Sequence, residues 1–150
     1  ALFAIDDLVD RLDLTVRELP TGTDPFVIGE FNVERAPTDH SKPGYSYRID
    51  DRVTIAGDTA PTEPVRSLAN GSDLLVHECA YPDGTESPGH STPTALGELL
   101  ADIDVDRILL THLFLEREPH ADELASTVSE HIDAAVDVDV ATDHTSVTLN

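Results

Sequence analysis

The sequence predicts an α/β fold, layered in the α+β manner, in which a mixed sheet carries helices on its outer face. Two observations support this fold class. Before Asp58, short β-prone runs follow one another with no helical pattern between them, which is typical of antiparallel strands. After Asp58, the order is helix, strand, helix, strand, helix, strand, which indicates parallel strands joined by crossover helices. The chain of 150 residues contains no internal repeat and no linker, so we expect one domain's worth of structure.

The first part of the chain is predicted to form one helix and then antiparallel strands. Apolar residues at i, i+3, i+4 and i+7 predict an amphipathic helix over residues 3–13. Strands are expected at Phe26–Ile28, Phe31–Glu34, Tyr45–Ile49 and Arg52–Ala56. The pair Asp50-Asp51 separates the last two runs and predicts a hairpin. The segment 36–44 is rich in proline and turn residues, so we expect a loop that carries His40.

The second part of the chain is predicted to alternate between helices and strands. Helices are expected at Pro64–Ala69, from Thr92-Pro93 onward, and along the spacing of Leu124, Val128 and Ile132. Strands are expected at Asp73–Cys79, Arg107–Leu110, Val136–Ala141 and Thr145–Leu149. The segment from Tyr81 to His90 contains two prolines and two glycines and is predicted to be a surface loop.

The charge of the chain restricts its surroundings and partners. It has 30 Asp and Glu against 9 Lys and Arg, a net charge of −21, and Lys42 is its one lysine. The acidic residues lie within segments of periodic apolar residues, which disfavours an acidic disordered tail. We therefore expect a cytoplasmic, salt-adapted (halophilic) protein with an acidic surface, because concentrated salt screens such self-repulsion. The charge disfavours a broad basic nucleic-acid surface, the single cysteine excludes a disulfide framework, and no segment is predicted to span a membrane.

Five polar residues lie where this fold would gather them. Asp58, Glu78 and His112 each lie at or near the end of a predicted strand, and His40 and His90 lie in loops that can reach the same edge. Carboxylate and imidazole groups suit zinc, manganese or iron. Each residue also has a purely structural interpretation. Asp58 could cap a helix, Glu78 could pair with an arginine, and the histidines could be ordinary surface or strand-end residues.

Several short motifs in order carry a resemblance to a known family. They are Asp-His-Ser-Lys-Pro-Gly-Tyr-Ser-Tyr-Arg-Ile (39–49), Ala-Gly-Asp-Thr (56–59), Asp-Leu-Leu-Val-His-Glu-Cys-Ala-Tyr (73–81), His-Ser-Thr (90–92) and Ile-Leu-Leu-Thr-His (108–112). This series resembles the second half of a metallo-β-lactamase-fold hydrolase, and within that superfamily it most resembles the ribonuclease Z-like branch. The implied fold is half of an αββα sandwich with helices on the outer faces.

The resemblance also implies a mechanism and a ligand set. It implies that His40 ligates one metal, Asp58 bridges two metals and His112 ligates the second. It further implies that Glu78 orients His90, whose imidazole contacts the scissile phosphate or protonates the leaving group. The cofactors would be two divalent metal ions, zinc with manganese or iron as alternatives, and the substrate a small phosphodiester or an RNA-like molecule.

One departure from the family pattern shapes the remaining expectations. The signature His-x-His-x-Asp-His is absent from the 150 residues, which leaves three metal ligands. We therefore expect residues 1–150 to form a single half-domain, with the amino-terminal half absent or supplied by another chain. The alternatives are an inactive fragment, a self-associating module (a homo-oligomer included), or a hydrolase of thioester, lactone or sulfate ester bonds.

Overall fold

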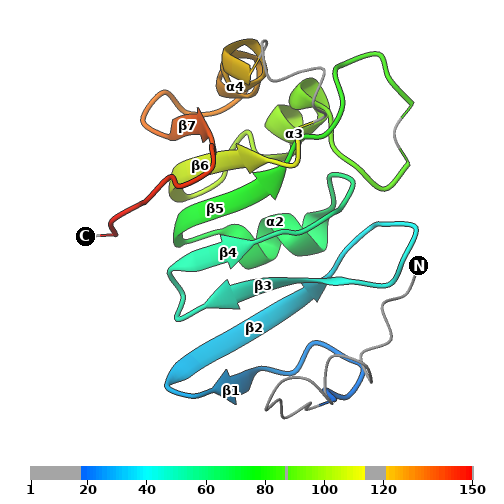
Figure 1. Cartoon of the computed structure of the whole chain (residues 1–150), viewed down its shortest axis with the longest axis vertical. Helices are drawn as coiled ribbons and strands as arrows, with labels where there is room; N and C mark the ends of the chain where they lie inside the picture. Colours follow the sequence, from blue (N-terminus) through cyan, green and yellow to red (C-terminus); the bar gives the residue numbers. More distant parts are fainter. Residues whose placement is uncertain (1–17, 87, 114–120, 150) are drawn as a thin grey trace.

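A computed structural model describes residues 18–86, 88–113 and 121–149, and its dominant feature is one mixed sheet (Figure 1). Seven strands lie side by side in the order of the sequence. They are β1 (Phe26–Ile28), β2 (Phe31–Pro37), β3 (Tyr45–Ile49), β4 (Val53–Ile55), β5 (Ser72–Glu78), β6 (Val105–Thr111) and β7 (Asp137–Val140). The mixed sheet with flanking helices confirms the predicted fold class.

The first four strands are antiparallel, as the sequence predicts. Asp50 and Asp51 have φ angles of 49° and 58°, so the β3–β4 hairpin turns through two left-handed residues. Such turns match the right-handed twist of the flanking strands, and aspartate tolerates this conformation well. Strand β2 continues three residues beyond the predicted end at Glu34, because β3 offers partners as far as the pair Pro37 and Tyr45.

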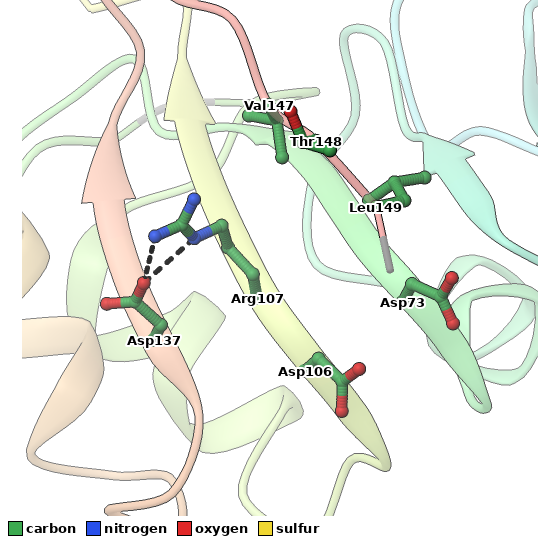
Figure 2. Close-up of a pocket in the computed structure, with 7 residues that line it drawn as sticks. All are labelled: Asp73, Asp106, Arg107, Asp137, Val147, Thr148 and Leu149. Carbon is green, nitrogen blue, oxygen red and sulfur yellow. Dashed lines mark hydrogen bonds and ion pairs between the residues drawn. The ribbon is translucent and has the colours of Figure 1, made fainter.

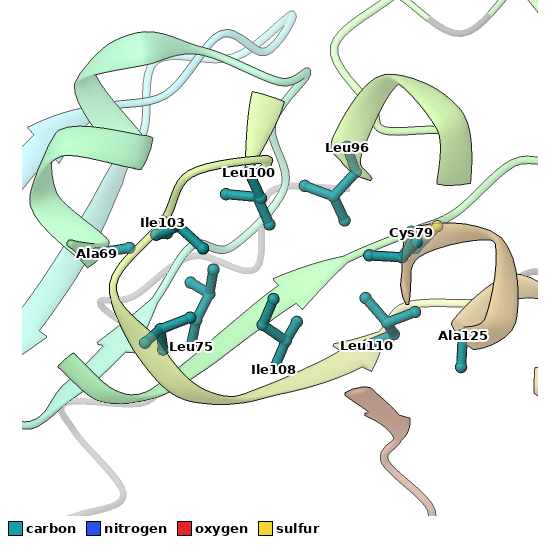
Figure 3. Packing of buried hydrophobic residues seen from close by; sticks show 11 residues of the cluster. Ala69, Leu75, Cys79, Leu96, Leu100, Ile103, Ile108, Leu110 and Ala125 are labelled. Carbon is teal, nitrogen blue, oxygen red and sulfur yellow. The ribbon is translucent and has the colours of Figure 1, made fainter. Parts of the chain in front are cut away.

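The last four strands are parallel, and each connection between them contains a helix. These helices are α2 (Glu63–Ala69), α3 (Pro93–Leu99) and α4 (Ala121–Ser129). Crossover connections of one hand place successive helices on one face of the sheet. Figure 3 shows the result, in which Leu75 and Ile108 of the sheet pack with Ala69 of α2, Leu96 of α3 and Ala125 of α4. Burial of these apolar side chains stabilises the parallel half.

The opposite face of the sheet is less covered within the described residues. The register places Ile28, Phe31 and Ile55 on the face that points away from Leu75 and Ile108. All three side chains are exposed. The two faces therefore differ, since one carries the helices and the other presents apolar side chains to its surroundings.

Three sequence-based expectations need correction or lie outside the description. The predicted strand Thr145–Leu149 is wrong: the residues are β-prone, but in the described structure no neighbouring strand pairs with them. The last helix ends at Ser129 rather than Ile132, because His131 donates its backbone N–H to the Val128 carbonyl at 3.1 Å and tightens the final turn. The helix predicted at 3–13 lies outside the described residues. Of the helices that are described, none is long and apolar enough to cross a membrane.

Candidate functional site

The five residues selected from the sequence lie at one edge of the sheet, where β2, β4, β5 and β6 end. His40 follows β2, Asp58 follows β4, Glu78 is the last residue of β5, and His112 follows β6. His90 lies in the loop between β5 and α3. Ligand sites of open α/β sheets form at the carboxyl ends of strands, so this is the edge at which a site is expected.

His90 lies at the centre of this group. Its ring centroid is 5.0 Å from that of His40, with the two ring planes at 73°. It is 5.6 Å from that of His112, with the planes stacked at 10°, and 5.6 Å from that of Tyr81. Loops that are far apart in the sequence therefore bring three imidazoles together.

The carboxylate of Glu78 holds His90 in place. The distance from Glu78 Oε1 to His90 Nδ1 is 2.8 Å, and the Glu78 side chain is only 2% exposed. An ionised carboxylate is only an acceptor, so Nδ1 carries the proton of this hydrogen bond. The carboxylate also accepts the backbone N–H groups of Thr59, Ala80 and Ser91 at 3.0–3.2 Å. These four donors explain why a carboxylate is tolerated in a buried position.

Asp58 and His112 form a second, more open pair. Asp58 Oδ1 is 3.7 Å from His112 Nδ1, and the two side chains are 46% and 49% exposed. Both follow their strands through left-handed backbone: Gly57 has a φ of 68° and His112 a φ of 59°. Left-handed residues other than glycine cost free energy and cluster at functional sites. A cavity of ≈ 100 Å³ opens here, lined by Ile55, Gly57, Asp58, Val76, Glu78, Thr111 and His112.

The donor chemistry of His40, Asp58 and His112 suits a divalent metal, because imidazole and carboxylate are ligands of zinc, manganese and iron. As placed, however, the described residues contain no group of three or more His, Cys, Asp or Glu side chains that could hold a metal ion. Three donors also leave a four-coordinate sphere incomplete. The three side chains are of the chemical type that binds a divalent metal, but a complete coordination sphere requires further donor atoms.

A wider groove of ≈ 500 Å³ adjoins this cavity on the His40 side. It extends from Asp58 across the loop between β2 and β3 and includes Lys42, the one lysine of the chain. The residues that line it are Thr38, His40, Lys42, Pro43, Gly44, Tyr45, Gly57 and Asp58. It gives a molecule bound at Asp58 room to extend along the β2–β3 loop.

The structure decides between several of the alternatives left open by the sequence. Asp58 does not cap α2, whose N-cap residue is Thr62. Glu78 pairs with His90 and with backbone N–H groups rather than with an arginine. His40 and His90 are partly buried in the group rather than free on the surface.

Sequence reasoning did not select Thr59 and Ser91, which bond the Glu78 carboxylate. The sequence feature that could have identified them is their position, since Thr59 directly follows Asp58 and Ser91 directly follows His90.

Two buried titratable groups on β5 and just after it stand apart from this chemistry. Burial lowers the pKa of His77, whose Nδ1 lies 2.8 Å from the Glu78 carbonyl oxygen. Burial, with the nearby Glu78 charge, raises the pKa of the Cys79 thiol to about 12. Burial thus disfavours the thiolate, and Cys79 packs in the apolar core beside the helices.

A hollow of ≈ 320 Å³ lies at the other end of the sheet, toward the starts of β5, β6 and β7 (Figure 2). Residues 147–149 form part of its wall, and Arg107 bonds Asp137 across it. The hollow also contains Asp73 and Asp106, so carboxylates outnumber its one cation. It shares no residue with the group around His90.

Comparison with known proteins agrees with this geometry. A model of the "Beta-lactamase superfamily domain" matches residues 3–113. The ribonuclease Z of Methanothermobacter thermautotrophicus is 41% identical over 66 residues, covering 41% of this chain and 22% of that protein. The ribonuclease Z of Exiguobacterium sp. is 32% identical over 101 residues, covering 65% of this chain and 33% of that protein. The chain thus spans about a third or less of the length of these relatives.

Solved structures share the fold. The metallo-β-lactamase fold protein YhfI from Bacillus subtilis superposes with a TM-score of 0.67 at 23% identity, covering 79% of this chain and 48% of that one. The short form of human tRNase Z superposes with a TM-score of 0.59 at 21% identity, covering 83% of this chain and 46% of that one. The sheet and helices described above are those of the metallo-β-lactamase fold.

Proposed function

Because this chain belongs to the β-lactamase superfamily, we propose that it contributes the Glu78–His90 pair and three metal ligands to a metal-dependent hydrolase of phosphodiester bonds. The observation that carries the proposal is the buried Glu78 carboxylate, 2.8 Å from His90 and at the same sheet edge as Asp58 and His112. Curated relatives named ribonuclease Z support phosphodiester cleavage as the reaction.

In the proposed site, His40, Asp58 and His112 would hold two divalent metal ions, with Asp58 shared between them. Zinc is the first candidate, and manganese and iron suit the same donors. When bound, such ions polarise a phosphoryl oxygen and lower the pKa of a coordinated water. The exposed position of Asp58 and His112 leaves room for these ions and for a substrate.

In this proposal, His90 assists departure of the leaving group. Its Nδ1–H is engaged by Glu78, so proton transfer to substrate would go through Nε2. A water oxygen attacks phosphorus and loses a proton to solvent, the bond from phosphorus to the leaving oxygen breaks, and a proton carried on Nε2 passes to that oxygen. The role of Glu78 is to hold the ring orientation, which a buried, four-fold bonded carboxylate does well.

We propose a small phosphodiester or an RNA-like molecule as the substrate class. A net charge of −21 disfavours a long nucleic-acid track held by basic residues. The groove beside His40 accommodates a flanking group of the substrate, and its Lys42 supplies one positive charge there.

The test is phosphodiester turnover by the purified full-length protein with added Zn²⁺ or Mn²⁺ in concentrated salt. We expect hydrolysis of bis-p-nitrophenyl phosphate by the wild type and a loss of at least about 100-fold in Asp58→Ala, since that substitution removes a shared ligand. Asp106→Ala is the matched control, because Asp106 is an exposed aspartate at the other end of the sheet.

Two results would contradict the proposal. Equal turnover in Asp58→Ala and Asp106→Ala would exclude Asp58 as a metal ligand of the reaction. Turnover of a thioester, lactone or sulfate ester, with none of the phosphodiester, would keep the site and replace the reaction class.

A further inference from the structure

We propose that Thr59 and Ser91 are positioning residues of the site, joined through Glu78 in a buried clasp that sets the relative places of His40, Asp58 and His90. The clasp consists of the side chains of Thr59, Glu78 and Ser91 together with the backbone of Thr59 and of Ser91. The inference rests on the proposed function for the roles of the three residues that it positions.

Each member of the clasp is next in sequence to a candidate residue, or bonds one. Thr59 follows Asp58 and donates its backbone N–H to Glu78 Oε1 at 3.2 Å. Ser91 follows His90 and donates its backbone N–H to Glu78 Oε2 at 3.1 Å. The Ser91 hydroxyl then donates to the Thr59 carbonyl oxygen at 2.9 Å, which closes the ring of contacts between two loops.

The Thr59 hydroxyl extends the clasp to the third loop. It accepts the backbone N–H of Asp39, the neighbour of His40, at 3.0 Å. It also donates to the Ala60 carbonyl oxygen at 2.8 Å, and the Ala60 N–H bonds the Asp39 carbonyl oxygen at 2.8 Å. One hydroxyl group thus ties the His40 loop to the loop that carries Asp58.

Burial makes these hydrogen bonds difficult to replace. Thr59 and Ser91 are both 0% exposed, so water cannot take the place of a lost partner without a structural change. Deletion of the Ser91 hydroxyl leaves the buried Thr59 carbonyl oxygen without this donor. Deletion of the Thr59 hydroxyl removes the acceptor of the Asp39 N–H and so the link between the two loops.

Gly89 provides an independent constraint on the same arrangement. Its φ is 83°, and a Cβ there would lie 2.9 Å from His40 Cδ2 and 3.1 Å from His40 Cα. Only glycine allows the loop before His90 to pack this closely on His40. The contact keeps the two imidazoles at their centroid distance of 5.0 Å. A displacement of about 1 Å at such a site can reduce turnover by about 100-fold, so these tethers matter for chemistry.

The experiment compares Thr59→Val and Ser91→Ala with Thr59→Ser, which keeps the hydroxyl. Thr54→Val and Ser72→Ala are matched controls, because the Thr54 and Ser72 hydroxyls form a buried pair at 2.8 Å away from the site. Amide hydrogen exchange is measured at Thr38 and Ala60, whose acceptors Gly44 and Asp39 remain in every variant. All variants are made in the full-length protein, and Zn²⁺ affinity is measured by calorimetry on the same proteins.

We expect at least about tenfold faster exchange at Thr38 and Ala60, and at least about tenfold weaker Zn²⁺ binding, in Thr59→Val and Ser91→Ala. Thr59→Ser keeps the hydroxyl and should show the exchange rates and the Zn²⁺ affinity of the wild type. Thr54→Val and Ser72→Ala should lose stability with no change in these exchange rates or in Zn²⁺ affinity. Exchange and Zn²⁺ affinity equal to those of the controls would overturn the proposal. A wild type that neither binds Zn²⁺ nor cleaves phosphodiesters would instead contradict the proposed function, while the exchange rates would still decide whether the clasp holds the loops.

Discussion

Replacing Glu78 by glutamine tests whether the buried carboxylate supports the site as argued. Oε1 accepts from the Thr59 N–H and His90 Nδ1, and Oε2 accepts from the N–H groups of Ala80 and Ser91. A glutamine has one acceptor oxygen and one NH₂ group, so two of these donors then face another donor. The less costly orientation places the NH₂ toward His90, because that ring can accept by carrying its proton on Nε2 instead.

In that orientation one buried backbone donor, the Thr59 N–H, remains unpaired. An unpaired buried donor costs about 1–3 kcal/mol, and the remaining bonds lose their ionic character. We therefore expect Glu78→Gln to reduce the free energy of unfolding by about 2–4 kcal/mol, measured by urea denaturation with far-UV circular dichroism in metal-free buffer. Glu63→Gln is the control, since its exposed carboxylate bonds Arg66 weakly at 3.4 Å and should cost less than about 0.5 kcal/mol. Equal losses in the two variants would refute the assigned network.

Three further predictions follow from other features of the chain. Burial lowers the pKa of His77 in the folded state, so as the pH decreases the unfolded state binds a proton on this ring at a higher pH than the folded state does. The free energy of unfolding should therefore fall below about pH 6.5, by up to about 1.4 kcal/mol per pH unit. His77→Phe should remove that part of the slope in urea midpoints measured across pH, and an unchanged slope would contradict a neutral buried His77. His112 has a φ of 59°, a conformation that glycine adopts without the steric cost that alanine incurs. In metal-free buffer His112→Gly should therefore be about 1 kcal/mol more stable than His112→Ala. Equal urea midpoints would show that the backbone there is unstrained. The net charge of −21 repels itself less in concentrated salt, because the Debye length falls from about 10 Å in about 0.1 M KCl to below about 3 Å in about 3 M KCl. The thermal midpoint should therefore rise over this range, and an unchanged midpoint would argue against a salt-adapted surface.

Local pattern was enough to predict most of the sheet. The alternation of β-prone and helical runs determines both the antiparallel half and the crossovers, and the Asp50-Asp51 pair predicts the β3–β4 turn. The prediction of a strand at Thr145–Leu149 was wrong, because its residues favour a strand but propensity does not report where the chain runs. Residues 147–149 line the hollow near the starts of β5 and β6 and do not pair with a strand of the described sheet. The clasp hydroxyls were missed for a similar reason, since Thr59 reaches Asp39 and Ser91 reaches Thr59 only in the folded chain.

The site forms at one edge because of the direction in which the strands run. β2 is antiparallel to β3, and β3 is antiparallel to β4, so β2 runs in the same direction as β4, β5 and β6. The segments that follow these four strands therefore begin at a single edge, and they carry His40, Asp58, His90 and His112. If one of these connections reversed the direction of the strand that follows it, one of these residues would lie at the opposite edge of the sheet. The tight turn at Asp50 and Asp51 thus contributes to the site without touching it, because it returns the chain to the direction that brings Asp58 beside His112.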